Sequence, residues 1–175
     1  MNLISFRTMS PTSNSDSLQL EMKSVQDTIE FGQRLGQHLT GGDILALTGD
    51  LGTGKTVLTR GIALGLGIPM DQVSSPTFTL IQEYTGPISL IHVDFYRLEK
   101  PSDISSLGLE EYFTPNTIVI IEWAERFPQI LPPDHMAILL EYGETEDIRL
   151  LSISGTGSRS IRIVANIHED WENRH

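Results

Sequence analysis

Eight consecutive residues, Gly49 to Thr56, have the types and the spacing that are most closely tied to a known chemistry. Their sequence, GDLGTGKT, satisfies the pattern G-x-x-x-x-G-K-[ST], in which glycines let backbone N–H groups turn inward around phosphate groups. Lys55 would reach the β and γ phosphates, and the hydroxyl of Thr56 would ligate Mg²⁺. This stretch therefore predicts a loop that holds a nucleoside triphosphate.

Two carboxylates could supply the acidic group that Mg²⁺ needs beside such a loop. Glu122 ends the apolar run TIVIIE, and Asp94 follows the run ISLIHV in the same way. A carboxylate at the end of a buried strand is costly to bury without a partner. Each is therefore either a metal ligand or a strand-end group that caps a loop, faces solvent or pairs with Arg97 or Arg126.

The segment SSPTFTL, residues 74–80, places hydroxyl side chains on both sides of Pro76. The residues alone favour a proline-containing turn at the start of a strand. The alternative is a switch segment in which Thr77 or Thr79 senses the γ-phosphate or its metal.

Aromatic side chains and a histidine lie near the two acids in the sequence. His92 and Tyr96 alternate with Asp94, so all three could face the same side of an extended strand. A partly buried structural role is the default for His92. We expect Trp123 and Trp171 to be packing residues.

The predicted loop requires a strand before it and a helix after it. The run DILALTG predicts a strand over 43–49, and KTVLTRGIALGLG predicts a helix over 55–67. Ser24 and Asp27 form an acidic variant of the capping box before another helix. The other predicted strands are 77–84, 88–95, 117–123, 136–142 and 148–155, and the first two of these form a hairpin. The other predicted helices are 24–40 and 158–175, and a short helix is predicted at the end of the segment 98–113.

This alternation of helices and buried strands predicts an α/β fold. We expect a three-layer sandwich like that of P-loop NTPases, with a mixed, mostly parallel sheet flanked by helices. Ligands of such sheets bind at the carboxyl ends of the strands, where the loop and both acids would lie.

Composition limits the domain organisation and the location. The chain has 175 residues, of which 39% are hydrophobic and 20% are charged, as in one globular domain of ordinary size. We expect residues 1–17 to be a flexible tail and 18–175 to be a single domain that carries the predicted P-loop. No apolar run approaches the roughly 20 residues of a membrane helix, and no cysteine is present, so we expect a cytoplasmic protein.

The charge of the chain disfavours independent binding to nucleic acid. There are 12 Lys and Arg against 23 Asp and Glu, which gives a formal net charge of −11. Such an excess repels a phosphate backbone unless basic residues gather on one face, and the sequence has no dense basic run. A protein partner could still bring the chain close to a nucleic acid.

Four motifs in order, GDLGTGKT, SPTFTL, HVDFYRL and IEWAE, resemble the TsaE (YjeE) family. This family is the small ATPase component of bacterial threonylcarbamoyladenosine modification of tRNA, and the resemblance covers roughly Ser24 to Tyr142. It implies that ATP and Mg²⁺ bind at the loop and that SPTFTL is a nucleotide-responsive switch, not a simple turn. The implied phosphate-binding residues are Leu51, Gly52, Thr53, Gly54, Lys55 and Thr56; the implied metal ligands are Thr56 and Glu122; and the implied catalytic residues are Lys55, Asp94 and Glu122.

The resemblance also implies an accessory role. Such a protein docks on a complex of TsaB and TsaD, in which TsaD transfers the threonylcarbamoyl group, and its ATP hydrolysis supports repeated turnover. The tRNA is then reached through the partners. Arg60, Arg97 and Arg126 are the possible arginine fingers within the chain, and a partner could supply one instead.

Two other functions use a similar loop. A small-molecule kinase would need an acceptor pocket and an arginine-bearing lid, but no arginine-rich loop is present. A GTP-dependent switch would need an N-K-x-D stretch, which the sequence lacks.

Overall fold

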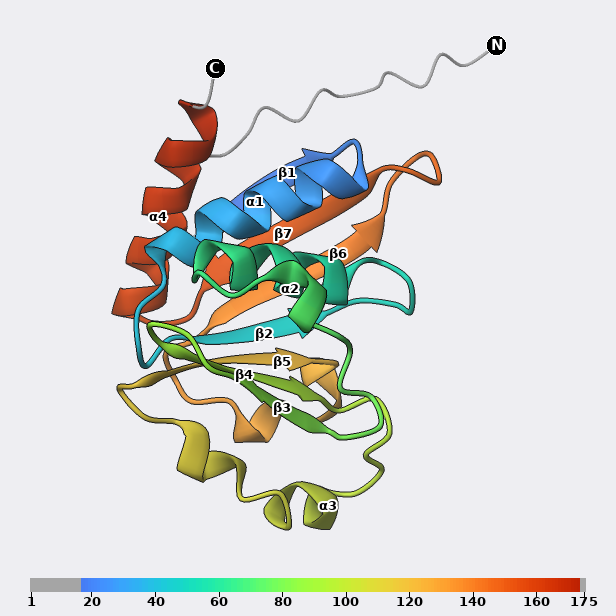
Figure 1. The fold of residues 1–175 in the computed structure, drawn as a ribbon. Helices are drawn as coiled ribbons and strands as arrows, with labels where there is room; N and C mark the ends of the chain where they lie inside the picture. The colour runs from blue at the N-terminus through green and yellow to red at the C-terminus, as the bar shows by residue number, and fades with distance from the viewer. Residues whose placement is uncertain (1–16, 174–175) are drawn as a thin grey trace.

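A mixed sheet of seven strands forms the centre of the fold, and the glycine-rich loop follows one of its inner strands (Figure 1). The computed structural model describes residues 17–173. The strands are β1 (Ser17–Met22), β2 (Ile44–Thr48), β3 (Ile81–Tyr84), β4 (Ser89–Asp94), β5 (Thr117–Glu122), β6 (Met136–Tyr142) and β7 (Arg149–Gly155). The α-helices are α1 (Val25–His38), α2 (Lys55–Gly65), α3 (Pro101–Ser105) and α4 (Ser158–Glu172), and the 3₁₀ helices are η1 (Met70–Gln72), η2 (Leu109–Tyr112), η3 (Ala124–Arg126) and η4 (Pro128–Ile130).

The strand order is β1-β7-β6-β2-β5-β4-β3. The pairs β6–β2, β2–β5 and β5–β4 are parallel, whereas β1–β7, β7–β6 and β4–β3 are antiparallel. Only β3 and β7 therefore run against the other strands, which confirms the mixed, mostly parallel sheet. The carboxyl ends of β2, β4 and β5 meet at one edge, with Glu122 in register with both Leu47 and Asp94.

Helices cover the sheet unequally on its two faces. In Figure 1, α1, α2 and α4 lie on one face and α3 lies on the other. The 3₁₀ helices η2, η3 and η4 contribute side chains to the core on this second face. Apolar side chains of β2 and β5 alternate between the two resulting cores: Leu45 and Ile120 belong to the first, and Ala46 and Ile121 to the second. The predicted three layers are thus present, although the second outer layer is built from short helices.

Most predicted elements are present, with two corrections. β1 is not among the predicted strands, although Leu18 and Met22 alternate with polar residues and are buried. The strand predicted over 77–84 begins only at Ile81, because Leu80 has a left-handed φ of 67° and donates to the carbonyl of Pro76 at 2.6 Å. Residues 77–80 therefore form a turn.

The described part of the chain includes the first helix and its cap but little of the predicted N-terminal tail. Of the predicted tail 1–17, residues 1–16 lie outside the described part, and residue 17 begins β1. The predicted cap of α1 is confirmed, since the Ser24 hydroxyl accepts the Asp27 N–H at 3.1 Å. No helix within the described residues is long and apolar enough to cross a membrane.

Glycines bring the backbones of α1 and α2 into direct contact, which fixes the position of the helix that follows the loop. A Cβ atom on Gly61 would lie 2.5 Å from the carbonyl oxygen of Ile29, and one on Gly32 would lie 2.8 Å from that of Leu58. Both distances are too short for real Cβ contacts, and the neighbouring atoms are backbone. The two helices can therefore pack this closely only because these positions lack side chains.

We expect Gly61→Ala to lower the free energy of unfolding by about 1–3 kcal/mol, the usual cost of overpacking. Alanine favours an isolated helix over glycine by up to about 1 kcal/mol, so a loss of stability would report the contact with α1. Urea denaturation measures the effect, with Gln37→Ala on the exposed face of α1 as the control. Unchanged or increased stability of Gly61→Ala would contradict this account of the helix pair.

Candidate functional site

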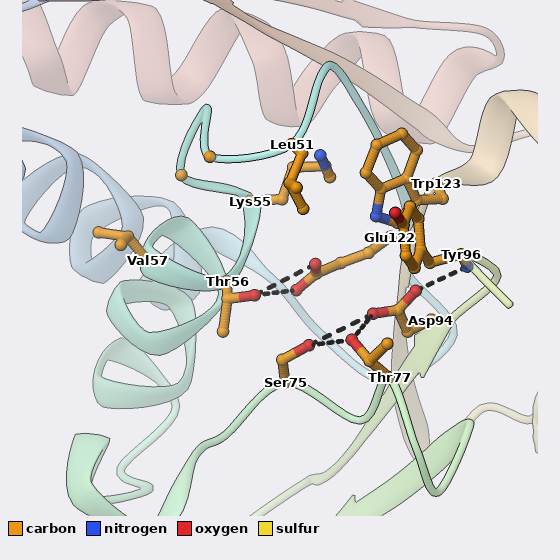
Figure 2. A pocket seen from close by; sticks show the side chains of 12 residues that line it. Leu51, Lys55, Thr56, Val57, Ser75, Thr77, Asp94, Tyr96, Glu122 and Trp123 are labelled. Carbon is orange, nitrogen blue, oxygen red and sulfur yellow. Dashed lines mark hydrogen bonds between the residues drawn. The ribbon is translucent and has the colours of Figure 1, made fainter. Parts of the chain in front are cut away.

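A cavity of about 320 Å³ opens beside the glycine-rich loop at the carboxyl ends of β4 and β5 (Figure 2). Four segments that are far apart in the sequence contribute its walls: the loop with the start of α2, the turn after η1, the end of β4 and the end of β5. The lining residues are Leu51, Gly52, Gly54, Lys55, Thr56, Val57, Ser75, Thr77, Asp94, Tyr96, Glu122 and Trp123.

The loop has the backbone that its glycines predict. Gly49 and Gly54 have φ values of 133° and 102°, in the region that favours glycine, and a Cβ on Gly49 would collide with the carbonyl oxygen of Leu140. α2 begins immediately afterwards at Lys55. Its first N–H groups have no partner within the helix and carry the positive end of the helix dipole, so this end of α2 suits an anion such as phosphate.

Lys55 is buried under the loop, with 4% of its surface exposed. Its Nζ donates to the carbonyl oxygens of Gly49 at 2.5 Å and Asp50 at 2.9 Å, and it lies 3.9 Å from the centre of the Trp123 ring. Burial lowers the pKa of Lys55 below its ordinary value, and nearby carboxylates, Glu122 foremost, oppose this shift. A cationic group is thus held inside the cavity on the side of the loop.

Thr56 and Glu122, the two predicted metal ligands, are in direct contact. The Thr56 hydroxyl lies 2.9 Å from Oε1 and 3.2 Å from Oε2 of Glu122. Glu122 ends β5 and is 3% exposed, and its Oε1 also lies 2.7 Å from Nε2 of His92. Figure 2 shows the carboxylate turned toward the threonine at the start of α2.

Asp94, the third predicted acid, lies at the end of the neighbouring strand β4 and is 1% exposed. One oxygen, Oδ2, accepts hydrogen bonds from the hydroxyls of Thr77 at 2.7 Å and Ser75 at 3.3 Å. The other, Oδ1, accepts the N–H of Tyr96 at 2.7 Å. This carboxylate therefore ties the turn after η1 to the end of the sheet, as Figure 2 shows.

The alternative in which the acids pair with arginine is wrong. Within residues 17–173, no ion pair joins an arginine to Asp94 or Glu122. Arg126 donates to the Leu98 carbonyl at 2.9 Å, and Arg97 lies 5.0 Å from the ring of Phe78. The described part of the cavity wall contains no arginine.

The structure distinguishes the two threonines of the SPTFTL segment. Thr77 lines the cavity and contacts Asp94, whereas Thr79 is exposed and does not line the cavity. The aromatic residue between them, Phe78, is 84% exposed. If this segment is a switch, Thr77 is the residue placed to sense the contents of the cavity.

The two tryptophans have different positions. Trp171 packs edge-on against Phe31, with ring centres 5.2 Å apart, which confirms a packing role. Trp123 instead lines the cavity, with a left-handed φ of 59° and its ring 4.9 Å from that of Tyr96. Trp123 also packs against the second core, as expected of a packing residue, while the turn after β5 directs its ring over Lys55.

A second cavity of about 110 Å³ also borders the loop, at residues 52–54. Its walls are the start of α1, the loop, the start of α2 and the turn between β6 and β7. Two hydrogen bonds connect this hairpin to the loop: the Tyr142 hydroxyl donates to the Leu51 carbonyl at 2.6 Å, and Arg149 donates to that of Gly52 at 3.5 Å. No motif in this part of the sequence predicted the second cavity.

Comparison of the sequence with known proteins gives the same family in each case. The profile described as "Threonylcarbamoyl adenosine biosynthesis protein TsaE" matches residues 22–150. The chain is 47% identical over 124 residues to a tRNA threonylcarbamoyladenosine biosynthesis protein TsaE of a Nostoc species, covering 68% of this chain and 75% of that protein. It is 43% identical over 144 residues to the Bacillus subtilis protein of the same name, covering 81% and 89% of the two chains.

The fold also resembles a solved structure. A crystal structure of YdiB from Bacillus subtilis superposes with a TM-score of 0.74 at 30% identity, covering 88% of this chain and 95% of that one.

Proposed function

Because this chain belongs to the TsaE family, we propose that it is the Mg²⁺-dependent, ATP-hydrolysing accessory subunit of tRNA threonylcarbamoyladenosine modification. The observation that carries this proposal is the convergence of Lys55, Thr56 and Glu122 on one cavity beside a glycine-rich loop. The relatives are named for threonylcarbamoyladenosine biosynthesis, and the cavity suggests what this subunit contributes to that process.

The two cavities suggest how ATP would lie. Its phosphates would occupy the 320 Å³ cavity, held by the amides of residues 51–56 and by Lys55. The nucleoside would extend past Gly52 and Gly54 toward the 110 Å³ cavity, where Val25 and Val57 provide apolar surface. A nucleotide in this position would bridge the loop.

The donors at the site suit Mg²⁺, which prefers oxygen ligands. The Thr56 hydroxyl and the Glu122 carboxylate would hold it, and both are already in contact. No group of three or more His, Asp or Glu residues in the described chain could form a complete metal cage. This agrees with Mg²⁺, which usually takes one or two protein ligands and completes its shell with phosphates and waters. When bound, Mg²⁺ would neutralise charge on the phosphate oxygens.

The side chains would divide the work of hydrolysis. Lys55 would exchange the carbonyl oxygens of Gly49 and Asp50 for phosphate oxygens, forming stronger, charge-assisted hydrogen bonds. Asp94 or Glu122 would orient the attacking water. Asp94 also holds Thr77 and Ser75, so a change at the γ-phosphate would reach residues 74–80 through these two hydrogen bonds.

We propose that TsaB and TsaD are the partners. The cavity wall within residues 17–173 lacks an arginine, and a finger supplied by a partner can raise the rate of hydrolysis about 10³–10⁵-fold. The net charge of −11 favours contact with tRNA through these partners over direct binding. A cytoplasmic location remains a prediction.

We expect the purified chain to hydrolyse ATP feebly and to turn it over at least about 10-fold faster when TsaB and TsaD are added, well within the range of a supplied arginine. Phosphate release under saturating ATP, with and without the partners, measures this. Full-speed hydrolysis by the isolated chain, unchanged by the partners, would contradict the accessory role. Transfer of phosphate to a small molecule would instead indicate a kinase.

A further inference from the structure

His92 lies in the middle of β4 with none of its surface exposed and contacts Glu122 directly. Its Nε2 atom is 2.7 Å from Oε1 of Glu122, and among the described residues its Nδ1 atom has no hydrogen-bond partner. A fully buried polar side chain is usually satisfied at all its polar atoms. The half-satisfied imidazole therefore indicates that the contact with Glu122 determines its position.

The contact defines which tautomer of the imidazole fits. A carboxylate oxygen only accepts hydrogen bonds, so Nε2 must carry the hydrogen and donate it to Glu122. The unpartnered Nδ1 is then an acceptor without a hydrogen, which avoids a buried N–H with no acceptor. A hydrogen on Nε2 of His92, donated to Glu122, thus satisfies the observed geometry.

The sheet register explains how a residue in the middle of one strand reaches the end of the next. His92 is in register with Ile120, and Asp94 is in register with Glu122, so His92 and Glu122 are diagonal neighbours on the same face. The ring of Tyr84 lies 6.5 Å from that of His92 on the side of β3. The imidazole is therefore held between a strand partner and Glu122.

The two carboxylate oxygens of Glu122 have different partners. Oε1 contacts both His92 and the Thr56 hydroxyl, whereas Oε2 contacts only Thr56 among these side chains. Without the imidazole, the Thr56 hydroxyl would be the remaining restraint among these side chains on the last torsion of Glu122, which is broad for glutamate. The hydrogen bond from His92 thus selects the orientation in which Glu122 faces Thr56.

We propose that His92 is a positioning residue that orients Glu122 for Mg²⁺, and this inference rests on the proposed function of the site. Groups that orient metal-ligating carboxylates typically contribute about 10–100-fold to metal affinity or activity. His92 does not line the phosphate cavity, so its loss should not change the affinity for nucleotide alone. It should reduce the factor by which Mg²⁺ increases the affinity for nucleotide.

Calorimetry tests this with a non-hydrolysable ATP analogue, titrated once with Mg²⁺ and once with EDTA. For the wild type we expect tighter binding with Mg²⁺. In His92→Phe, which keeps the ring but removes the donor, we expect the ratio of the two affinities to fall about 10–100-fold while the affinity in EDTA is unchanged. Leu90→Val, two residues away on the same strand face, is the control for packing and should keep the wild-type ratio.

Two amide variants separate positioning from folding. The amide of His92→Gln can reach Glu122 and should preserve most of the ratio, whereas His92→Asn is one methylene shorter and should lose it. In the wild type without nucleotide or metal, nitrogen NMR shifts of the imidazole should show a hydrogen on Nε2.

The outcomes distinguish this inference from the function on which it rests. If the wild type binds the analogue more tightly with Mg²⁺ but His92→Phe and His92→Asn keep the same ratio, the positioning role is wrong and the proposed site stands. If the wild type shows no effect of Mg²⁺, both the metal site and the role of His92 are overturned. An Nε2 atom without a hydrogen would also overturn the positioning role.

Discussion

Lys55→Ala is expected to lower kcat/KM for ATP hydrolysis by at least about 10²–10³-fold, the range for removing one donor to developing charge. The Lys55 ammonium is the cation that the loop itself supplies inside the cavity, and it lies under the predicted phosphate position. Phosphate release in the presence of TsaB and TsaD gives the measurement, since the isolated chain should be slow.

The resting contacts of Lys55 make a control necessary. Its Nζ donates to two carbonyl oxygens of the loop, so the variant could also disturb the loop. Lys55→Met keeps most of the aliphatic stem and should lose activity equally, while urea denaturation shows whether either variant is unstable. Wild-type turnover by folded Lys55→Met would contradict the role assigned to the ammonium.

Glu122→Gln should produce the second large effect, a decrease of about 10²-fold or more in the rate of ATP hydrolysis. This is the usual effect of removing a group that stabilises or positions charge at the reacting phosphate. The amide keeps the shape of the side chain and can still accept from Thr56 and His92 through its oxygen. It lacks the negative charge that Mg²⁺ requires. The loss should therefore be greatest at low Mg²⁺ concentration.

The same substitution should not destabilise the protein without nucleotide. Glu122 is 3% exposed, no arginine of the described chain pairs with it, and Lys55, whose pKa it raises, has its own hydrogen bonds to two loop carbonyls. A neutral amide in the same place avoids the cost of burying a charge. Thermal unfolding of Glu122→Gln should thus occur at the wild-type temperature or above it. A large drop in stability, or wild-type hydrolysis at every Mg²⁺ concentration, would contradict the role of Glu122.

The central part of the site was predictable from the sequence because its signals are local. The glycine pattern determines the backbone of the loop, and Lys55 and Thr56 follow at fixed positions at the start of α2. Glu122 and Asp94 each end an apolar run, and parallel strands place such ends side by side. The roles of these residues remain predictions.

Other features depend on contacts between distant segments, which single-sequence patterns do not contain. The hydrogen bond from His92 to Glu122 arises from the register of β4 and β5, so the sequence could only suggest a structural histidine. The second cavity forms because the β6–β7 hairpin folds back over the loop. The position of the Trp123 ring depends on the left-handed backbone of Trp123 itself, which the sequence does not signal because the residue is not a glycine.

The central claim is that the cavity beside the loop binds ATP through Lys55. Equilibrium binding of ATP with Mg²⁺ to the purified chain, measured side by side for the wild type and Lys55→Ala, tests it most directly. We predict saturable binding of one ATP per chain by the wild type and binding at least about 10-fold weaker by the variant, the loss of one charge-assisted contact. Equal affinities of the two folded proteins, or no binding by the wild type, would contradict the claim.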